Sequence, residues 1–261
     1  MKEAVTISSR DNPLLVRLRK LARASAAYRK LGAVWIEGQH LCSALHSRGW
    51  VAAQALVSES AWQQPALREL AQWATRIAVV PDGLFASVSG LDSPAACGIG
   101  FAIDAPESAA IQPGLPSVVL DRVQDAGNVG SILRSASALG FGQVLAIEGS
   151  AALWAPKVLR AGMGAHFGLA LVEGLAEGDL DRLRLPLLAS SSHAEATLDA
   201  AVLPFPCAWI FGHEGQGVTP SLLARCSQTL RIPQPGGEES LNVAAAAAIC
   251  LYATRRAGAG R

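Results

Sequence analysis

The second half of this chain alternates short apolar runs with helix-like segments, and this alternation limits the fold more than any other feature. Short apolar runs typical of strands cover residues 117–123, 143–147, 187–190, 208–212 and 229–233. Helices are predicted over 129–139, 156–162 and 241–254. Strands that alternate with helices form mainly parallel sheets covered on both faces. We therefore predict an α/β fold with a mainly parallel sheet.

Near the end of this half, a turn-rich loop runs directly into an apolar helix. Proline and glycine residues at 233–237 stop the strand that ends near Ile232, and Ser240 or Asn242 can cap the following helix. The first backbone N–H groups of a helix have no partner inside it, so the polar or anionic end of a ligand fits there. Taken alone, the same residues could form only a turn and an ordinary cap.

Two further segments place polar side chains after a predicted strand. Residues 120–134 form a strand end, a polar loop with Asn128 and a helix start that carries Arg134. Residues 211–218 follow another strand and hold Glu214 between glycines. Ligand sites of parallel α/β sheets lie beyond the carboxyl ends of the strands, which is where all three segments fall.

In this order and spacing, residues 120–134, 211–218 and 232–243 resemble the signature of the SpoU (TrmH-like) branch of the SPOUT methyltransferases. These enzymes transfer a methyl group from S-adenosylmethionine to a ribose 2′-hydroxyl of RNA, and the match covers about residues 117–254. The resemblance implies a deep trefoil knot near the C-terminus, although chains are otherwise almost never knotted. It also implies two sets of site residues. The active site would contain Asn128, Arg134, Glu214, Ser240 and Asn242, and the S-adenosylmethionine pocket would be lined by Gly212, Ile232, Leu241 and Ser190.

Three positions depart from the family pattern. Ala126 stands where proline is usual, which loosens the loop without removing a functional group. His213 replaces a common asparagine, and Ala244 replaces a common serine, so one potential hydrogen bond near the ligand is absent. These departures concern substrate preference and leave the reaction itself in place.

The predicted site residues suit methyl transfer, which requires alignment of oxygen, methyl carbon and sulfur together with removal of a proton. Arg134 is expected to hold a phosphate or to orient the 2′-hydroxyl, because a guanidinium stays protonated and is a poor general base. Glu214 either accepts the proton or orients Arg134. Asn128, Ser240 and Asn242 can fix the loops and the ribose, cap their helices, or do both.

The net charge of +1 conceals a strongly basic first segment. Residues 1–30 contain eight basic and two acidic side chains, a net charge of +6, so the remainder carries −5. A solvated helix face would give the same charge pattern. Taken together with the methyltransferase motifs, however, the basic charge of this segment favours contact with RNA phosphates. The candidate RNA-binding residues are Arg10, Arg17, Arg19, Lys20, Arg23, Arg29 and Lys30.

The first half is predicted to be a smaller α/β domain. A basic amphipathic helix follows the capping and turn cluster at 7–13, then a strand at 33–38, a helix at 39–47 and strands at 51–58 and 77–80. This order resembles the RNA-binding domain found ahead of the catalytic domain in rRNA-directed members of the family. Glu37 could have a role there or only start a turn with Gly38.

The division into domains follows the composition of the chain. Residues 104–116, rich in proline, glycine and small side chains, form the best linker. We predict an N-terminal RNA substrate-binding domain at 1–103 and a methyltransferase domain at 117–261. The family's usual homodimer is expected by resemblance alone.

Composition limits the compartment and the cofactors. Hydrophobic residues make up 51% of the chain, which is ample for a buried core, and the first residues lack the apolar stretch of a signal peptide, so the cytoplasm is expected. The five cysteines form no Cys-x-x-Cys pair, and the histidines lack metal-ligand spacing. We expect cysteines in the core and no metal.

The function that follows is methyl transfer from S-adenosylmethionine to a ribose 2′-hydroxyl, with 23S rRNA as the expected substrate. A tRNA substrate and a catalytically inactive RNA-binding relative remain alternatives. The presence of all the polar motif residues weighs against the inactive relative. A nicotinamide-dinucleotide enzyme is disfavoured because Gly127 to Gly130 lack the Gly-x-Gly-x-x-Gly spacing.

Overall fold

The computed structural model describes residues 2–91, 98–237 and 240–259. The chain separates into two compact units. The N-terminal unit comprises residues 1–107 and 154–167, and the C-terminal unit comprises 108–153 and 168–261. The proposed linker at 104–116 and the domain limits drawn from it stay predictions.

The N-terminal unit contains a five-stranded sheet in the order β1-β4-β3-β5-β2. Strands β1, β4 and β3 are parallel, whereas β5 runs antiparallel to both β3 and β2. The alternating pattern predicted β2, β3 and part of β4 but missed β1 and β5. Gly100 in β5 lies against the ring of Trp35, where a Cβ atom would collide with the indole. The bounds are β1 Ala4–Thr6, β2 Ala33–Glu37, β3 Ala52–Ser58, β4 Ala74–Val80 and β5 Ile99–Asp104.

The predicted basic amphipathic helix is confirmed as α1, Pro13–Arg23. The Asn12 side chain accepts a hydrogen bond from the Leu14 N–H at 2.9 Å, and Pro13 occupies the first turn, where its missing N–H costs nothing. Leucines at helical spacing form its buried face. The other helices are α2 Ala27–Leu31, α3 Gln39–Ser47, α4 Glu59–Trp62, α5 Pro65–Ala71, α6 Asp82–Val88 and α8 Pro156–Gly162.

Glu37 has a structural role at the end of β2. Its buried carboxylate accepts hydrogen bonds from the Ser89 hydroxyl, the Gly90 N–H and the Trp35 indole N–H. A buried carboxylate needs such donors to offset the loss of water. These contacts support a structural role for Glu37 within the fold and not a role in binding RNA.

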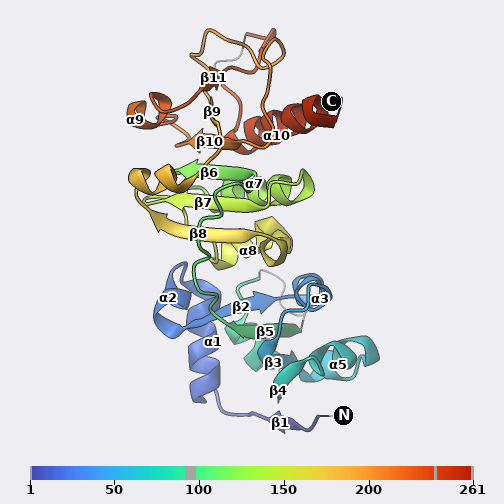
Figure 1. Ribbon diagram of the computed structural model, residues 1–261. Helices are drawn as coiled ribbons and strands as arrows, with labels where there is room; N and C mark the ends of the chain where they lie inside the picture. Colours follow the sequence, from blue (N-terminus) through green and yellow to red (C-terminus); the bar gives the residue numbers. More distant parts are fainter. Residues whose placement is uncertain (1, 92–97, 238–239, 260–261) are drawn as a thin grey trace. The chain divides into compact units, whose positions relative to one another are not determined.

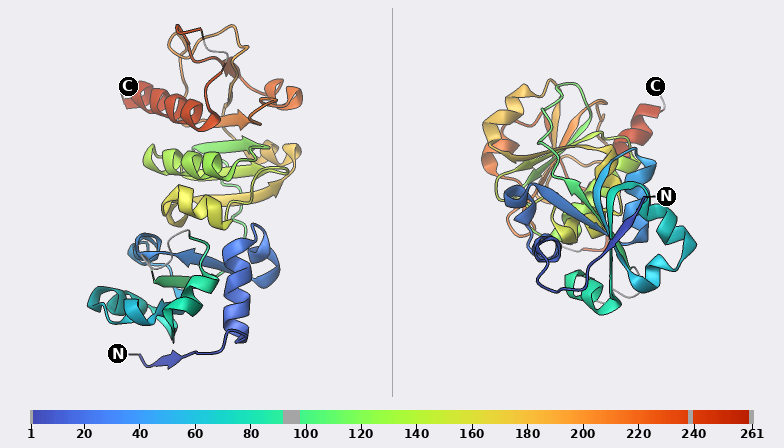
Figure 2. Two further views of the ribbon diagram at one scale, coloured as in Figure 1. Left: turned by 180° about the vertical axis from the view of Figure 1, so that it is seen from behind. Right: turned by 90° about the horizontal axis from the view of Figure 1, so that it is seen from below.

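The C-terminal unit contains the predicted parallel sheet, with six strands in the order β11-β9-β10-β6-β7-β8 (Figure 1). Its strands fan out with the usual β-sheet twist (Figure 2). The prediction missed the edge strand β8, whose apolar pattern is interrupted by Glu173 and Gly174. The bounds are β6 Ser117–Asp121, β7 Gln143–Ile147, β8 Ala170–Leu175, β9 Leu187–Ser190, β10 Ala208–Gly212 and β11 Gln228–Leu230.

Both faces of this sheet are covered. Helix α10 (Val243–Ala259) packs against α7 (Ala126–Ala138) and β10, and the Trp209 indole N–H donates to the Thr254 hydroxyl at 2.9 Å. The strand residues that point away from α7 and α10, including Val119, Leu145 and Ile210, form a second core. This core also contains side chains of the 3₁₀ turn at 177–182 and of α9 (Pro220–Leu223). The mainly parallel α/β fold is thus confirmed, while the trefoil knot stays a prediction.

Candidate active site

A cavity of about 570 Å³ opens at the carboxyl ends of β9, β10 and β11. This volume lies within the range of small-molecule sites, and the position follows from the parallel strands, whose carboxyl ends meet at one edge. All four residues predicted to bind the cofactor line the cavity, namely Ser190, Gly212, Ile232 and Leu241. Three predicted active-site residues, Glu214, Ser240 and Asn242, line it as well.

A chain of hydrogen bonds joins the three sequence motifs. The Asn242 side-chain NH₂ donates to Asn128 Oδ1 at 2.9 Å, and the Asn128 NH₂ donates to Glu214 Oε1 at 3.1 Å. Asn242 Oδ1 in turn accepts from the Ala244 N–H at 2.9 Å and so caps α10. Of the two candidate caps, the structure therefore uses Asn242 and leaves Ser240 exposed in the cavity lining.

Glu214 is held as an acceptor of several hydrogen bonds. Besides Asn128, the backbone N–H groups of Asp125 and Gln124 donate to its carboxylate at 3.1 and 3.3 Å. Desolvation by burial is the largest single influence and raises the pKa of Glu214, but these hydrogen bonds together outweigh it and lower the pKa below the ordinary value. An ionised carboxylate with these donors is better suited to holding the two loops together than to accepting a proton.

A second set of contacts fixes the loop after β10 to the end of β6. Asp121 is fully buried, and its carboxylate accepts from the Thr219 N–H at 2.7 Å and from Arg122 Nε at 3.0 Å. Arg122 Nη1 donates a hydrogen bond to Gln216 Oε1 at 2.8 Å. The hydrogen bond from Arg122 to Asp121 raises the pKa of the Arg122 guanidinium. Arg122 has φ of 57°, an uncommon conformation for a side chain with a Cβ, which ends β6 two residues before its predicted limit.

His213 completes the loop that carries Glu214. Its Nδ1 accepts from the N–H groups of Gly215 and Gln216 at 3.0 and 3.3 Å, and its backbone pairs with that of Gly217. An asparagine oxygen makes the same kind of local contact. The departure from the family pattern at His213 therefore preserves the turn and adds an aromatic ring to the cavity wall.

The starts of two long helices meet beside this network, since Asn242 caps α10 and Asn128 lies in the first turn of α7. The Asp125 carboxylate caps α7 by accepting from the Asn128 N–H at 2.8 Å. Helix starts carry partial positive charge and favour anions. At the start of α7 this charge is met by the carboxylates of Asp125 and Glu214, and at the start of α10 the first N–H groups donate to Asn242.

Arg134 lies outside the described hydrogen-bond network. It is exposed on α7, six residues beyond Asn128, or about 9 Å along the helix axis. It is absent from the described lining of the cavity. Its charged side chain is thus free to meet a substrate from solvent, and its role stays a prediction, as do those of the other predicted site residues.

The sequence prediction missed several residues of the site. Ser191, Ser192 and His193 line the cavity directly after β9, and their polar run at a strand end was the available signal. Asp121 and Arg122 carried no signal, because neither the burial of the carboxylate nor the positive φ can be read from the sequence.

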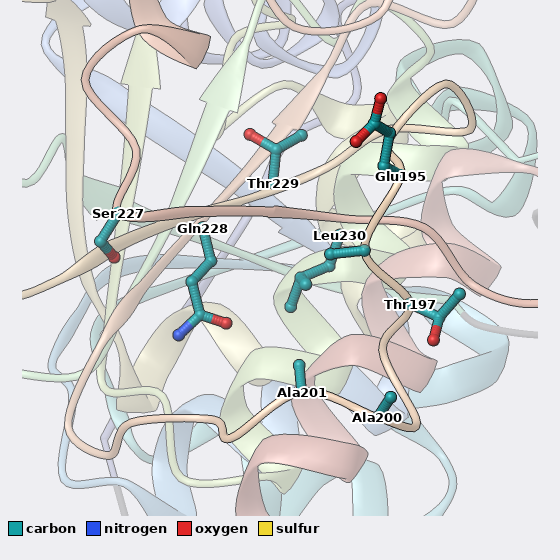
Figure 3. A pocket seen from close by; sticks show the side chains of 9 residues that line it. Glu195, Thr197, Ala200, Ala201, Ser227, Gln228, Thr229 and Leu230 are labelled. Atoms are coloured by element: carbon teal, nitrogen blue, oxygen red, sulfur yellow. The ribbon is translucent and has the colours of Figure 1, made fainter.

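A second cavity, of about 580 Å³, lies between β11 and the loop at 195–201. Figure 3 shows Gln228 and Thr229 pointing to opposite sides of their strand, with Glu195 the one charged side chain in the described lining. None of the predicted catalytic residues lines this cavity. The catalytic hypothesis therefore rests on the cavity beside Glu214.

The cysteines behave as core residues where the structure describes them. Cys42, Cys207 and Cys250 are buried, and burial raises the pKa of Cys207 and Cys250 to about 12, so both stay thiols. Cys226 is half-buried, and Cys97 lies outside the described residues. Among the described residues, no three His, Cys, Asp or Glu side chains are grouped to hold a metal, and no helix is both long and apolar enough to cross a membrane.

Comparison with known proteins gives a consistent picture. The profile of the SpoU rRNA Methylase family matches residues 116–252. Over 97% of its length the chain is 30% identical to an uncharacterized tRNA/rRNA methyltransferase of Synechocystis, 94% of which is covered. It is 34% identical to the 23S rRNA (guanosine(2553)-2′-O)-methyltransferase RlmP of Bacillus subtilis, over 53% of this chain and 57% of that protein.

A solved structure extends the likeness to the whole fold. The crystal structure of an RNA 2′-O ribose methyltransferase matches 98% of this chain and 100% of its own, with a TM-score of 0.81 and 28% sequence identity. Both units described above therefore have counterparts in one solved chain.

Proposed function

Because this chain belongs to the SpoU rRNA Methylase family, we propose that it transfers the methyl group of S-adenosylmethionine to a ribose 2′-hydroxyl of rRNA, with 23S rRNA as its substrate. The observation that carries the proposal is the hydrogen-bond chain from Asn242 through Asn128 to Glu214. It joins three segments distant in sequence at a cavity of suitable size.

The cavity residues fit the cofactor chemically. Bound S-adenosylmethionine supplies an electrophilic methyl group on a sulfonium sulfur. Gly212, which has no side chain, lines the cavity with its backbone, and Leu241 lines it between the polar side chains of Ser240 and Asn242. A Cβ on Gly212 would collide with the backbone of Gly217 and Val218, so only glycine permits this close approach.

The other residues position the substrate. Glu214, held by Asn128 and two backbone N–H groups, fixes the loops after β6 and β10 against each other. Arg134 binds the phosphate or the 2′-oxygen of the nucleotide through its guanidinium, which stabilises negative charge as the oxygen attacks. Ser240 lines the cavity, and we assign its hydroxyl to a hydrogen bond with the ribose.

The direct test is methylation of RNA with S-adenosylmethionine labelled in its methyl group. Total RNA from cells that lack the protein is separated into 23S rRNA, 16S rRNA and tRNA, and each fraction is digested with alkali. A 2′-O-methyl group blocks cleavage of the adjacent phosphodiester, so label in alkali-resistant dinucleotides of 23S rRNA supports the proposal. Label in mononucleotides would show base methylation and contradict it, and label in tRNA alone would reassign the substrate.

The basic segment is the proposed RNA-anchoring surface, but its arginines also hold the fold. Guanidinium groups of Arg17, Arg19 and Arg23 donate to the backbone carbonyls of Leu31, Arg10 and Ser87. Alanine at these positions would disturb the fold as well as the charge. Lys20 and Lys30 are exposed and better suited to a test. If both contact phosphates, the double alanine variant lowers the log–log salt slope of RNA affinity by about two.

We also propose that the protein forms the homodimer expected from its family. Helix α10 exposes Ile249 and Tyr252, which lie three residues apart and therefore on one face. Sedimentation of the wild type and of the Tyr252→Glu variant would test this, since a charge in an apolar interface favours the monomer. The cytoplasmic location stays a prediction.

A further inference from the structure

One large aromatic side chain of the N-terminal unit is exposed to solvent over more than half of its surface. Trp73 is 53% exposed and stacks on His46, with ring centroids 3.5 Å apart and an interplanar angle of 29°. The stack orients the indole, while more than half of the side chain remains open to solvent. An oriented aromatic ring with an accessible surface suits stacking by another flat ring.

Sheet geometry places further residues around Trp73. Trp73 and Val51 directly precede β4 and β3, and their neighbours Ala74 and Ala52 are register partners in these parallel strands. The two side chains therefore lie at the same end of the sheet, and Val51 is 71% exposed. Lys2, just before the parallel strand β1, donates from Nζ to the carbonyls of Gln72 and Ala74 on either side of Trp73.

The charge around this end of the sheet favours an anionic partner. Arg48 follows His46 by two residues at the end of α3, and Arg76 is exposed near the start of β4. Together with Lys2 and Arg68, the segments that meet here carry four cations against the carboxylates of Glu3 and Glu69. A flat aromatic surface beside an excess of cations is the usual arrangement for an unpaired base and its phosphates.

We propose that Trp73 is a stacking platform for an unpaired base of the RNA substrate. The proposal rests on the RNA-directed function and adds a contact separate from the basic segment. Helix α1 of the basic segment packs against β2, which is one edge strand of the sheet, whereas Trp73 precedes β4, which lies beside the other edge strand, β1. The N-terminal unit would therefore hold phosphates mainly through the basic segment and a base through Trp73.

The test compares labelled single-stranded oligoadenylate with a blunt RNA duplex of equal length, by fluorescence anisotropy over a series of salt concentrations. Loss of one stacked base lowers affinity about ten-fold, so Trp73→Ala should weaken single-strand binding by that factor. Because stacking releases no counterions, the salt slope should stay unchanged, unlike that of the Lys20/Lys30 double variant. Duplex binding should be unaffected, and Trp73→Phe should retain most of the single-strand affinity.

The controls separate the stacking role of Trp73 from the proposed RNA methyltransferase function. Val202→Ala removes an exposed apolar side chain from the C-terminal unit and should change neither affinity. Equal single-strand affinity in Trp73→Ala and wild type, or equal loss for strand and duplex, would overturn the stacking role while leaving RNA methylation intact. A wild type that neither binds nor methylates RNA would instead refute the proposed function. Loss of self-association in Trp73→Ala without change in RNA affinity would assign this face to a second copy of the chain.

Discussion

Replacing Asp121 by asparagine tests whether the loop that carries Glu214 depends on a buried carboxylate. Asp121 accepts hydrogen bonds from the Thr219 N–H at 2.7 Å and from Arg122 Nε at 3.0 Å. Asparagine has nearly the same shape but only one acceptor oxygen, so its NH₂ group must face one of these two donors. A hydrogen bond to a charged group contributes about 1.5–3 kcal/mol, and Arg122 also loses its counter-charge.

We therefore expect Asp121→Asn to lower the free energy of unfolding of the C-terminal unit by about 3 kcal/mol. A domain of this size loses about 2–4 °C of melting temperature per kcal/mol, so the shift should be about 6–12 °C. Denaturant unfolding gives the free energy, and calorimetry should show weaker S-adenosylmethionine binding because the loop at 213–218 lines the cavity. Thr219→Ala is the matched control, because it keeps the N–H and removes only the hydroxyl contact to Glu177 at 3.3 Å. An Asp121→Asn protein within about 1 kcal/mol of that control would refute the argument.

Three other substitutions address the cofactor, the substrate and the network. Gly212→Val should abolish S-adenosylmethionine binding by displacing the loop backbone, whereas Gly215→Ala, whose new Cβ would meet only the His213 ring at 3.8 Å, should bind normally in calorimetry; equal binding by both variants would remove the basis for the pocket. Arg134→Ala should lower methyl transfer by a factor of order 10² while sparing cofactor affinity, and near-normal turnover would exclude its positioning role. Since the pKa of Glu214 is lowered in the folded state, its contribution to stability is present above the unfolded pKa and lost as pH falls through the folded pKa. Thermal melts should thus show wild type more stable than Glu214→Gln near neutral pH and the difference shrinking in acid; a difference independent of pH would contradict this linkage.

The sequence predicted the C-terminal sheet well because its strands are short, apolar and separated by clear turn residues. It failed at β8 and β5, where a strand contains glycine or carries a charge and only tertiary packing shows its pairing. Gly100 illustrates the reason, since its place in β5 depends on the Trp35 ring of a neighbouring strand.

Site residues could be predicted where polar side chains follow the ends of strands. They could not be predicted where their place depends on the backbone conformation of a loop or on contacts between distant segments. Glu214, Asn128 and Asn242 were expected from the resemblance to the family signature, and the structure joins them in one network. Arg122 was missed because its positive φ and its contact with Gln216 depend on a loop 94 residues further along the chain. His213 appeared as a departure from pattern, yet its ring nitrogen makes the local contacts expected of asparagine.

The order of strands in the C-terminal sheet has a consequence for synthesis on the ribosome. Strand β10 lies between β6 and β9 in the sheet although it follows both in the chain. Strand β9 therefore cannot join the sheet beside β6 until β10 has left the ribosome and can pair with both. The cavity beside Glu214 is lined by residues 190–193, 211–218, 223, 232, 234, 240–243 and 246, and the last of these, from 240 on, lie at the start of α10, after β11. A nascent chain that exposes only β6 to β9 thus has half a sheet and no place for a methyl donor. Ligand binding cannot assist its early folding and can stabilise only the nearly finished protein.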